Sequence, residues 1–317
     1  MKALAPRLYL ALPILLSLTF LGCPPSGQQY VLNVYSAGVS NASITSSTGH
    51  AGSTHYTTLV ASGANVSLTA PATVSGRVFT GWTGDVTSSN ETIGFLMASP
   101  KTVTANYEPG PPAVLHSFAG GTGDGKTPYG SLTPSGSVLY GMTQLGGTAD
   151  KGVVFRLNQD GTGYTILHHF SGGNGAGEPL GSLTLSGSTL YGVTFKGGTK
   201  DFGAVFSMNV DGTEYTVLHS FDGAPDDGAF GYGSLTLSGS TLYGITSGHG
   251  SHSAGVVFSV KTDGSDYTIL HDFAGGPGDG QWPVGAVTVS GSNIYGVTSH
   301  GGLYGAGILF RMNTDGT

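Results

Sequence analysis

The side chains best suited to chemistry are acids and aromatic rings in glycine-rich segments of the C-terminal part of the chain. Asp226 and Asp227 are adjacent, while Asp124 and Asp279 each lie between two glycines. Two carboxyl groups about 5 to 10 Å apart can hydrolyse a glycosidic bond, and aromatic rings beside polar groups are typical of ligand sites. Because Asp-Gly pairs also form turns, we predict binding without catalysis. The predicted ligand-binding residues are Asp124, Tyr129, Asp226, Asp227, Tyr232, Asp279 and Trp282, with Phe195, Phe230 and Tyr304 as further aromatic candidates.

Histidines form two groups that could bear on metal binding. One group recurs in Leu-His-x-Phe segments, as His116, His168, His219 and His271. Since these segments read as strands that pack against neighbours, we predict buried histidines bonded to the backbone. The other group, His249, His252 and His300, lies in glycine-rich loops, where we expect solvated side chains rather than zinc ligands. Gly-Asp-Gly loops expose oxygens suited to calcium, but no EF-hand spacing is present, so we expect no cofactor and keep calcium as the weaker alternative.

Most of these residues belong to a sequence repeat. Tyr140, Tyr191, Tyr243 and Tyr295 lie 51, 52 and 52 residues apart, each in a Leu/Ile-Tyr-Gly-x-Thr motif. Within one copy, alternating apolar residues predict strands at 181–186, 188–194, 203–209 and 215–221, joined by tight Gly-containing turns. Four antiparallel strands in about 50 residues match the size of a propeller blade. We therefore predict an all-β chain in which residues 113–317 form a β-propeller-like array of four repeats.

The predicted loops separate by length. Short Ser-Gly and Asp-Gly turns lie at one end of each repeat, and two longer glycine-rich loops lie at the other. The longer loops differ between copies, and binding residues concentrate on loops held by a rigid scaffold. We therefore place the predicted ligand-binding residues on this long-loop face.

The ends of the array leave two interpretations open. Residues 113–116 correspond to a fourth strand, whereas the array stops at Asp315-Gly316-Thr317, just before a fourth strand would begin. The first segment could complete the last sheet and close a four-bladed ring, which would hide open strand edges. Alternatively, the array is part of a larger propeller.

The repeat motifs resemble the Gloeobacter/Verrucomicrobia tandem-repeat family. The matching features are the Val-Phe-x-[Leu/Met/Val] strand, the Leu-His-x-Phe strand, and Leu-Tyr-Gly-x-Thr followed by Gly-Gly. The resemblance extends over residues 113–317. It implies a surface repeat protein of unassigned activity, and it brings no known catalytic residues.

Residues 28–108 form a separate predicted β module, joined to the array by a linker at 109–112. The motif G-x-x-F-x-G-W-x-G-D, from Gly76 to Asp85, and the ending K-x-V-T-A-x-Y, from Lys101 to Tyr107, resemble the divergent InlB B-repeat family. The resemblance implies a compact β-grasp-like spacer or adhesion unit. Trp82 could stack on a sugar, but we predict that it is the core aromatic of this small domain.

The N-terminus reads as an export signal. Lys2 and Arg7 precede the uncharged apolar stretch Leu8 to Leu21, which is too short to span a bilayer. The following Gly22-Cys23 resembles a bacterial lipoprotein signal, which implies a signal peptide at 1–22, a lipidated Cys23, and a tether at 23–27. We therefore expect a lipid-anchored protein of the bacterial cell envelope.

The charge composition limits the classes of partner that we expect. Lys and Arg total 11 and Asp and Glu total 18, a net charge of −7, and without a basic patch we expect no nucleic-acid partner. The favoured function is a non-catalytic surface binding or adhesion protein that presents its long-loop face to an extracellular glycan or protein. One alternative is a polysaccharide-active enzyme that uses the loop carboxylates. The other is a structural envelope protein.

Overall fold

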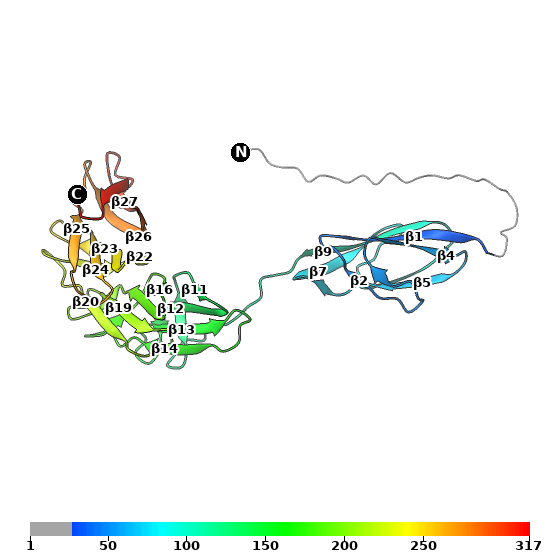
Figure 1. The fold of residues 1–317 in the computed structure, drawn as a ribbon, viewed down its shortest axis with the longest axis horizontal. Helices are drawn as coiled ribbons and strands as arrows, with labels where there is room; N and C mark the ends of the chain where they lie inside the picture. Colours follow the sequence, from blue (N-terminus) through cyan, green and yellow to red (C-terminus); the bar gives the residue numbers. More distant parts are fainter. Residues whose placement is uncertain (1–26) are drawn as a thin grey trace. The chain divides into compact units, whose positions relative to one another are not determined.

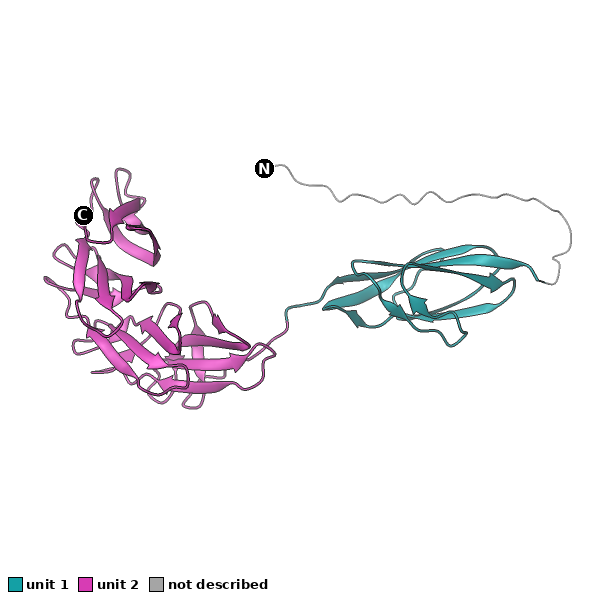
Figure 2. Cartoon of the chain, viewed as in Figure 1, with its two compact units in different colours: residues 1–112 teal, residues 113–317 magenta. Residues whose placement is uncertain are grey.

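The computed structural model describes residues 27–317, which contain strands and turns but no helix. They belong to two compact units, residues 1–112 and 113–317 (Figure 2). The predicted signal peptide and Cys23 lie outside the described residues. Within the described range, no helix is long and apolar enough to cross a membrane. The all-β prediction is confirmed.

The first unit is built on a five-stranded sheet in the order β4-β1-β9-β7-β6, in which β1 and β9 run parallel (Figure 1). Alternate residues of the central strands face inward, so Leu32, Val34, Val103 and Ala105 are buried. The strands are β1 (Gln29–Ala37), β2 (Ser43–Ile44), β3 (Gly52–Ser53), β4 (Tyr56–Ala61), β5 (Asn65–Thr69), β6 (Thr73–Val74), β7 (Arg77–Gly84), β8 (Thr92–Leu96) and β9 (Lys101–Pro109).

The second unit repeats one antiparallel sheet four times. Sheet 1 comprises β10 (Gly125–Pro128), β11 (Thr133–Ser135), β12 (Val138–Gly146), β13 (Val153–Asn158) and β14 (Thr165–His169). Sheet 2 comprises β16 (Thr184–Ser186), β17 (Thr189–Val193), β19 (Ala204–Asn209) and β20 (Thr216–Ser220), beside the short pair β15 (Ala176–Gly177) and β18 (Lys196–Gly197). Sheet 3 comprises β21 (Gly228–Gly231), β22 (Thr236–Ser238), β23 (Thr241–His249), β24 (Val256–Lys261) and β25 (Thr268–Asp272). Sheet 4 comprises β26 (Gly280–Ser290), β27 (Asn293–Gly301) and β28 (Leu309–Asn313).

A glycine in the Tyr-Gly-x-Thr motif has a specific packing role. A Cβ on Gly192 in β17 would overlap the ring of Phe206 on the neighbouring strand β19. Gly141, Gly244 and Gly296 stand in the same relation to Phe155, Phe258 and Phe310. The motif thus lets each sheet lay an aromatic ring across its own second strand.

The hydrophobic core of this unit lies between the sheets. Tyr191, Val193 and Val205 of sheet 2 are buried in one cluster with residues of sheet 3, including Leu235 and Phe258. Equivalent clusters join sheets 1 and 2 and sheets 3 and 4. Sheets that bury their faces against neighbouring sheets in series give the propeller-like packing expected from the repeat.

The two ends of the array do not join to close a ring. Residues 113–118 lie outside any strand, and β28 pairs only with β27 among the described residues. Figure 1 shows the four sheets following one another along an arc whose first and last sheets stay apart. The closed four-bladed ring is therefore not formed within this chain, because its closing strand does not pair with sheet 4.

Candidate functional site

The two long loops of each repeat lie together, as the sequence analysis placed them. The Gly147 N–H, in the loop between β12 and β13, donates to the carbonyl oxygen of Asp124 in the loop before β10. Gly198, Gly250 and Gly302 make the equivalent bonds to Gly175, Asp227 and Asp279. The backbone thus holds both loops together at the same end of every sheet.

Asp124 is the centre of a side-chain network that we call the first clasp (His116, Asp124 and Tyr164). Its carboxylate accepts hydrogen bonds from the Tyr164 hydroxyl at 2.7 Å, from His116 Nε2 at 3.2 Å, and from the Ala119 and Gly125 N–H groups at 2.7 Å. Burial raises the pKa of this carboxyl, but the donors outweigh it and the net pKa lies below the ordinary value. The carboxylate therefore stays ionised and saturated with donors.

The second clasp (His219, Asp227 and Tyr267) repeats this arrangement. The Asp227 carboxylate accepts from His219 Nε2 at 2.9 Å and from the Tyr267 hydroxyl at 2.5 Å, and the Asp222 and Gly228 N–H groups complete the set. Burial raises its pKa, but the donors again produce a net lowering. In the last repeat Asp279 binds His271 at 3.1 Å, and the corresponding tyrosine position lies beyond Thr317.

These contacts correct the prediction for the recurring histidines. His116, His219 and His271 bond to aspartate side chains rather than to the backbone, and they are only partly buried. The signal was present in the sequence, because the histidine and aspartate are 8 residues apart in three repeats and the tyrosine follows 40 residues later in two. The pattern becomes apparent only when the histidines and the acids are considered together.

The interface between sheets 1 and 2 lacks the aspartate. Gly175 occupies its place, as its backbone bond to Gly198 shows. His168 still stacks on Tyr215 with ring centroids 3.8 Å apart, but the Tyr215 hydroxyl is buried without a hydrogen-bond partner. Burial, together with the smaller effect of the neighbouring His169, lowers the pKa of His168 to about 4. This incomplete clasp keeps the aromatic stack without the charge.

The clasps sort the predicted acids into two kinds. Asp124, Asp227 and Asp279 are committed to bonds within the chain. Asp226, although adjacent to Asp227, is exposed, whereas Asp227 is buried. Of the acids predicted to bind ligand, Asp226 therefore remains the one available to a ligand.

The predicted aromatic residues lie on two parts of the loop face. Tyr129 of sheet 1 approaches Tyr232 of sheet 3, and its hydroxyl beside that of Tyr232 raises the pKa of Tyr232. Trp282 is exposed in β26 and meets the His300 ring edge-on at 4.6 Å. The structure therefore brings Tyr129 and Tyr232 together across two repeats and leaves Trp282 with a histidine neighbour.

The three loop histidines occupy different environments. His249 Nδ1 accepts the Ala224 N–H at 2.8 Å and its ring packs on Phe202 at 4.5 Å. His300 packs on Trp282, and His252 is exposed. Within residues 27–317, no three histidine, cysteine or acidic side chains converge on a point where they could hold a metal ion.

A hollow on the loop face lies where the loop before sheet 3 meets sheet 2. It has a volume of about 370 Å³ and its lining includes Asp222, Asp226, Asp227 and Lys200. Lys200 Nζ lies 3.7 Å from the Asp222 carboxylate. This hollow, which we call the sheet-3 hollow, combines an exposed ion pair with the second clasp as its wall.

An aromatic cluster lies beside the sheet-3 hollow. Phe230 stacks on Phe195 at 5.0 Å and packs edge-on against Phe202 at 5.7 Å. The ammonium group of Lys196 lies over the Phe230 ring, 4.7 Å from its centroid. The predicted aromatic candidates Phe195 and Phe230 thus contact each other and carry a cation on their surface.

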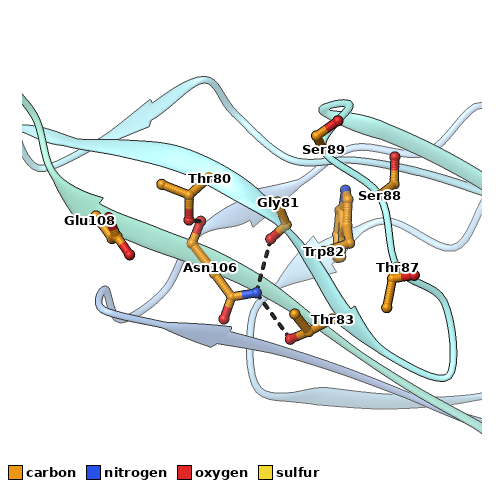
Figure 3. Close-up of a pocket in the computed structure, with 9 residues that line it drawn as sticks. All are labelled: Thr80, Gly81, Trp82, Thr83, Thr87, Ser88, Ser89, Asn106 and Glu108. Atoms are coloured by element: carbon orange, nitrogen blue, oxygen red, sulfur yellow. Dashed lines mark hydrogen bonds between the residues drawn. The ribbon is translucent and has the colours of Figure 1, made fainter.

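A second hollow belongs to the first unit. Figure 3 shows its polar lining, in which the Asn106 side-chain amide donates to Gly81 O and Thr83 Oγ1. Its volume is about 570 Å³. Trp82 lies at its floor but is buried, and its Nε1 donates to Glu91 O at 2.9 Å. The prediction that Trp82 is a core aromatic rather than an exposed stacking platform is confirmed.

Comparison with protein families matches both units. Residues 79–310 match the Gloeobacter/Verrucomicrobia repeat, and residues 42–111 match the divergent InlB B-repeat domain. Both resemblances stated from the sequence are thus confirmed. No curated protein matches the chain.

Several solved structures match parts of the chain with low structural similarity. A nidogen/laminin complex is 16% identical with a TM-score of 0.39, and the match covers 74% of this chain and 82% of that one. TolB from Acinetobacter baumannii is 17% identical with a TM-score of 0.41, covering 64% of this chain and 43% of that one. The computationally designed Ika4 protein is 13% identical with a TM-score of 0.37, covering 64% and 99%. These scores are low, so the fold assignment rests on the repeated sheets themselves.

Proposed function

Because the chain belongs to the Gloeobacter/Verrucomicrobia repeat family, we propose that it is a non-catalytic binding protein of the bacterial envelope that presents its long-loop face to an extracellular glycan. The proposal rests on one contrast. The clasp aspartates are hydrogen-bonded within the chain, whereas other predicted ligand-binding side chains are exposed to solvent. The clasps hold the loops in place, while Asp226 faces solvent from one of those loops, and Tyr129, directly after β10, and Trp282, in β26, are also exposed. Exposed rings and a polar group on rigid loops are suited to binding without chemistry.

The carboxylates support binding over hydrolysis. A glycosidase needs one carboxyl group that can give up or accept a proton near the scissile bond. Asp124 and Asp227 are held ionised by their donors, and their hydrogen-bonding capacity is taken up within the chain. The exposed Asp226 has no second free carboxylate from the predicted set beside it.

The glycan proposal is tested by binding to an array of neutral and acidic polysaccharides. We expect retention on at least one polymer, loss of at least tenfold in affinity for Trp282→Ala or Tyr129→Ala, and no release of reducing ends. The matched control is Leu59→Ala, an exposed apolar residue of the first unit. Retention on no polymer, or equal affinity of all variants, would contradict the proposal, and cleavage that depends on Asp226 would favour the enzyme.

Envelope location is proposed from the signal sequence, with Cys23 as the lipidated residue and the membrane as a partner through that lipid. In a bacterial host, the full chain should incorporate labelled fatty acid and partition with detergent, and Cys23→Ser should abolish both. Equal labelling of the two proteins would contradict the anchor. Loss of the anchor would leave the glycan proposal standing, since the loop face belongs to the other unit.

A further inference from the structure

The residue paired with the tyrosine of the Tyr-Gly-x-Thr motif divides the sheets into two kinds. It is a serine in sheets 2 and 3, Ser207 and Ser259, and an arginine in sheets 1 and 4, Arg156 and Arg311. Both arginines are exposed, whereas Ser207 is half-buried and Ser259 is buried. The short serine side chain therefore leaves open a space that an arginine side chain can fill.

A hollow lies beside each of the two serines. The first short-turn hollow, between sheets 2 and 3, has a volume of about 470 Å³, and the second, between sheets 3 and 4, about 300 Å³. Their linings correspond one repeat apart, with Thr189, Ser207 and Glu214 in the first and Thr241, Ser259 and Asp266 in the second. Both lie beside the Ser-Gly and Asp-Gly turns, at the end of the sheets away from the long loops.

Each hollow holds a carboxylate on a backbone conformation that favours glycine. Glu214 has a φ of 55° and Asp266 a φ of 53°. In sheet 1, which carries the arginine, the matching residue is Gly163, with a φ of 68°. Since this left-handed region is unfavourable for residues that have a Cβ, the two sheets with a serine keep an acid where glycine would be less strained. The serine and the acid therefore occur together beside the same hollow.

The lining of the first hollow can both donate and accept hydrogen bonds. Thr189, Ser207 and Thr216 contribute hydroxyl groups, which do either, whereas the Glu214 carboxylate only accepts. Tyr191 also lines the hollow and is buried, so it adds apolar surface to the wall. Polar groups placed around apolar surface in a hollow of this size are typical of small-ligand sites. A sugar residue, which presents hydroxyl groups beside C–H surface, matches this lining.

The charges of the hollows select among sugars. Among its described lining residues, the first hollow has one carboxylate, Glu214, and no lysine or arginine. The second has Asp266 and Asp315 against one cation, Lys261, whose Nζ donates to Thr241 Oγ1 at 3.0 Å. The excess of carboxylates disfavours an acidic sugar in both hollows, and Lys261 disfavours an amine in the second. A ligand common to the two hollows is therefore uncharged.

We propose that the two short-turn hollows are binding sites for neutral hexose residues, one between sheets 2 and 3 and one between sheets 3 and 4. These sites are separate from the long-loop face, so they do not rest on the function proposed above. Two equivalent sites on one chain bind two residues of the same polymer, which raises the apparent affinity without any new contact.

The first test is a residue-resolved NMR titration of the chain with glucose, galactose and mannose. The amide signals of Ser207 and Ser259 report the two hollows, and at least one of these sugars should shift both signals to saturation. Glucuronic acid should bind about tenfold more weakly or worse, because its carboxylate meets those of the hollows. If none of the three sugars shifts either signal, or if glucuronic acid or glucosamine binds more tightly than they do, the proposal is wrong.

The second test uses residues that the chain itself carries at the matching places. Ser207→Arg gives sheet 2 the arginine of sheet 1 and should abolish the sugar-dependent shift at Asn209, while the shift at Ser259 persists. Ser137→Arg is the matched control, because Ser137 is an exposed serine of a turn in sheet 1, and it should leave both hollows unchanged.

Glycine variants test the carboxylates without filling the hollows. Glu214→Gly should weaken binding in the first hollow, and Asp266→Gly in the second, each by about tenfold or more, because each removes a charged hydrogen-bond acceptor. Both variants also relieve an unfavourable φ and should stay folded. Unchanged binding in Ser207→Arg and Glu214→Gly would overturn the proposal. Trp282→Ala tests the long-loop face alone, so either proposal can fail without the other.

Discussion

The imidazole of His219 lies flat against the ring of Tyr267, with the ring centroids 3.5 Å apart and the planes within 9°. His219 belongs to β20 of sheet 2, whereas Tyr267 precedes β25 of sheet 3, so the stack joins neighbouring repeats. Asp227 accepts a hydrogen bond from each of the two side chains. The same stack recurs between His116 and Tyr164. The second clasp thus ties two sheets and one long loop together.

Replacing Asp227 should destabilise the protein far more than replacing its neighbour. Asp227→Asn keeps the shape but cannot accept all the donors that converge on this buried carboxylate, and we expect a loss of about 2 to 4 kcal/mol in the free energy of unfolding. Asp226→Asn is the matched control, since Asp226 is exposed, and should change stability by less than about 0.5 kcal/mol. Chemical denaturation measures both. Equal effects would mean that the second clasp contributes no stability.

The complete and incomplete clasps should respond differently to loss of a tyrosine hydroxyl. Tyr267→Phe removes a donor to Asp227 and should cost about 1 to 2 kcal/mol. Tyr215→Phe removes a buried hydroxyl that has no partner, so it should be neutral or stabilising. Thermal unfolding of the two variants gives the comparison. A larger loss for Tyr215→Phe would show that its hydroxyl has a partner in solution.

His168 should make stability depend on pH in mildly acidic solution. Burial lowers its pKa to about 4 from an ordinary value of 6.5, so the folded state resists protonation while the unfolded state accepts it. The stabilisation is complete above pH 6.5 and is lost as the pH falls toward 4. After allowance for solvent screening, we expect about 1 to 2 kcal/mol over this range.

The variant His168→Gln isolates this contribution. Its unfolding free energy should depend less on pH between 6.5 and 4 than that of the unaltered chain, whatever its absolute stability. The remaining histidines are common to both proteins and cancel in the difference. If the two pH profiles run parallel, His168 titrates normally in the folded protein.

The repeat architecture was predictable because its signals are local and recur. Spacing of the Tyr-Gly-x-Thr motif defined the repeat, and apolar alternation predicted the strands, as sheet 2 illustrates. The clasps were harder to foresee because Asp227 and Tyr267 are 40 residues apart and meet only when neighbouring sheets pack. In addition, the repeat that contains Gly175 lacks the aspartate, so the spacing of histidine, aspartate and tyrosine does not recur in every copy.

Some features of the predicted ligand-binding residues could likewise be predicted from local sequence, whereas others depend on packing. The position of Asp226 on an exposed loop could be predicted from the order of turns and loops, whereas Trp282 lies in strand β26 rather than in a loop. The burial of Asp227 beside an exposed Asp226 could not, because adjacent residues share one sequence context and differ only in the direction of their side chains. Tyr129 and Tyr232 approach each other from repeats that are not neighbours in the sequence, which no local pattern encodes.

The clasps should hold the long loops rigid, and residue-resolved amide hydrogen exchange measures this rigidity at single residues. The Ala119, Asp222 and Ala274 N–H groups each donate to a clasp aspartate, whereas Ser171 stands at the matching place where Gly175 replaces the aspartate. We predict slow exchange at the first three amides and faster exchange at Ser171, by about tenfold or more, which corresponds to about 1.4 kcal/mol. Equal exchange at all four amides would contradict the claim.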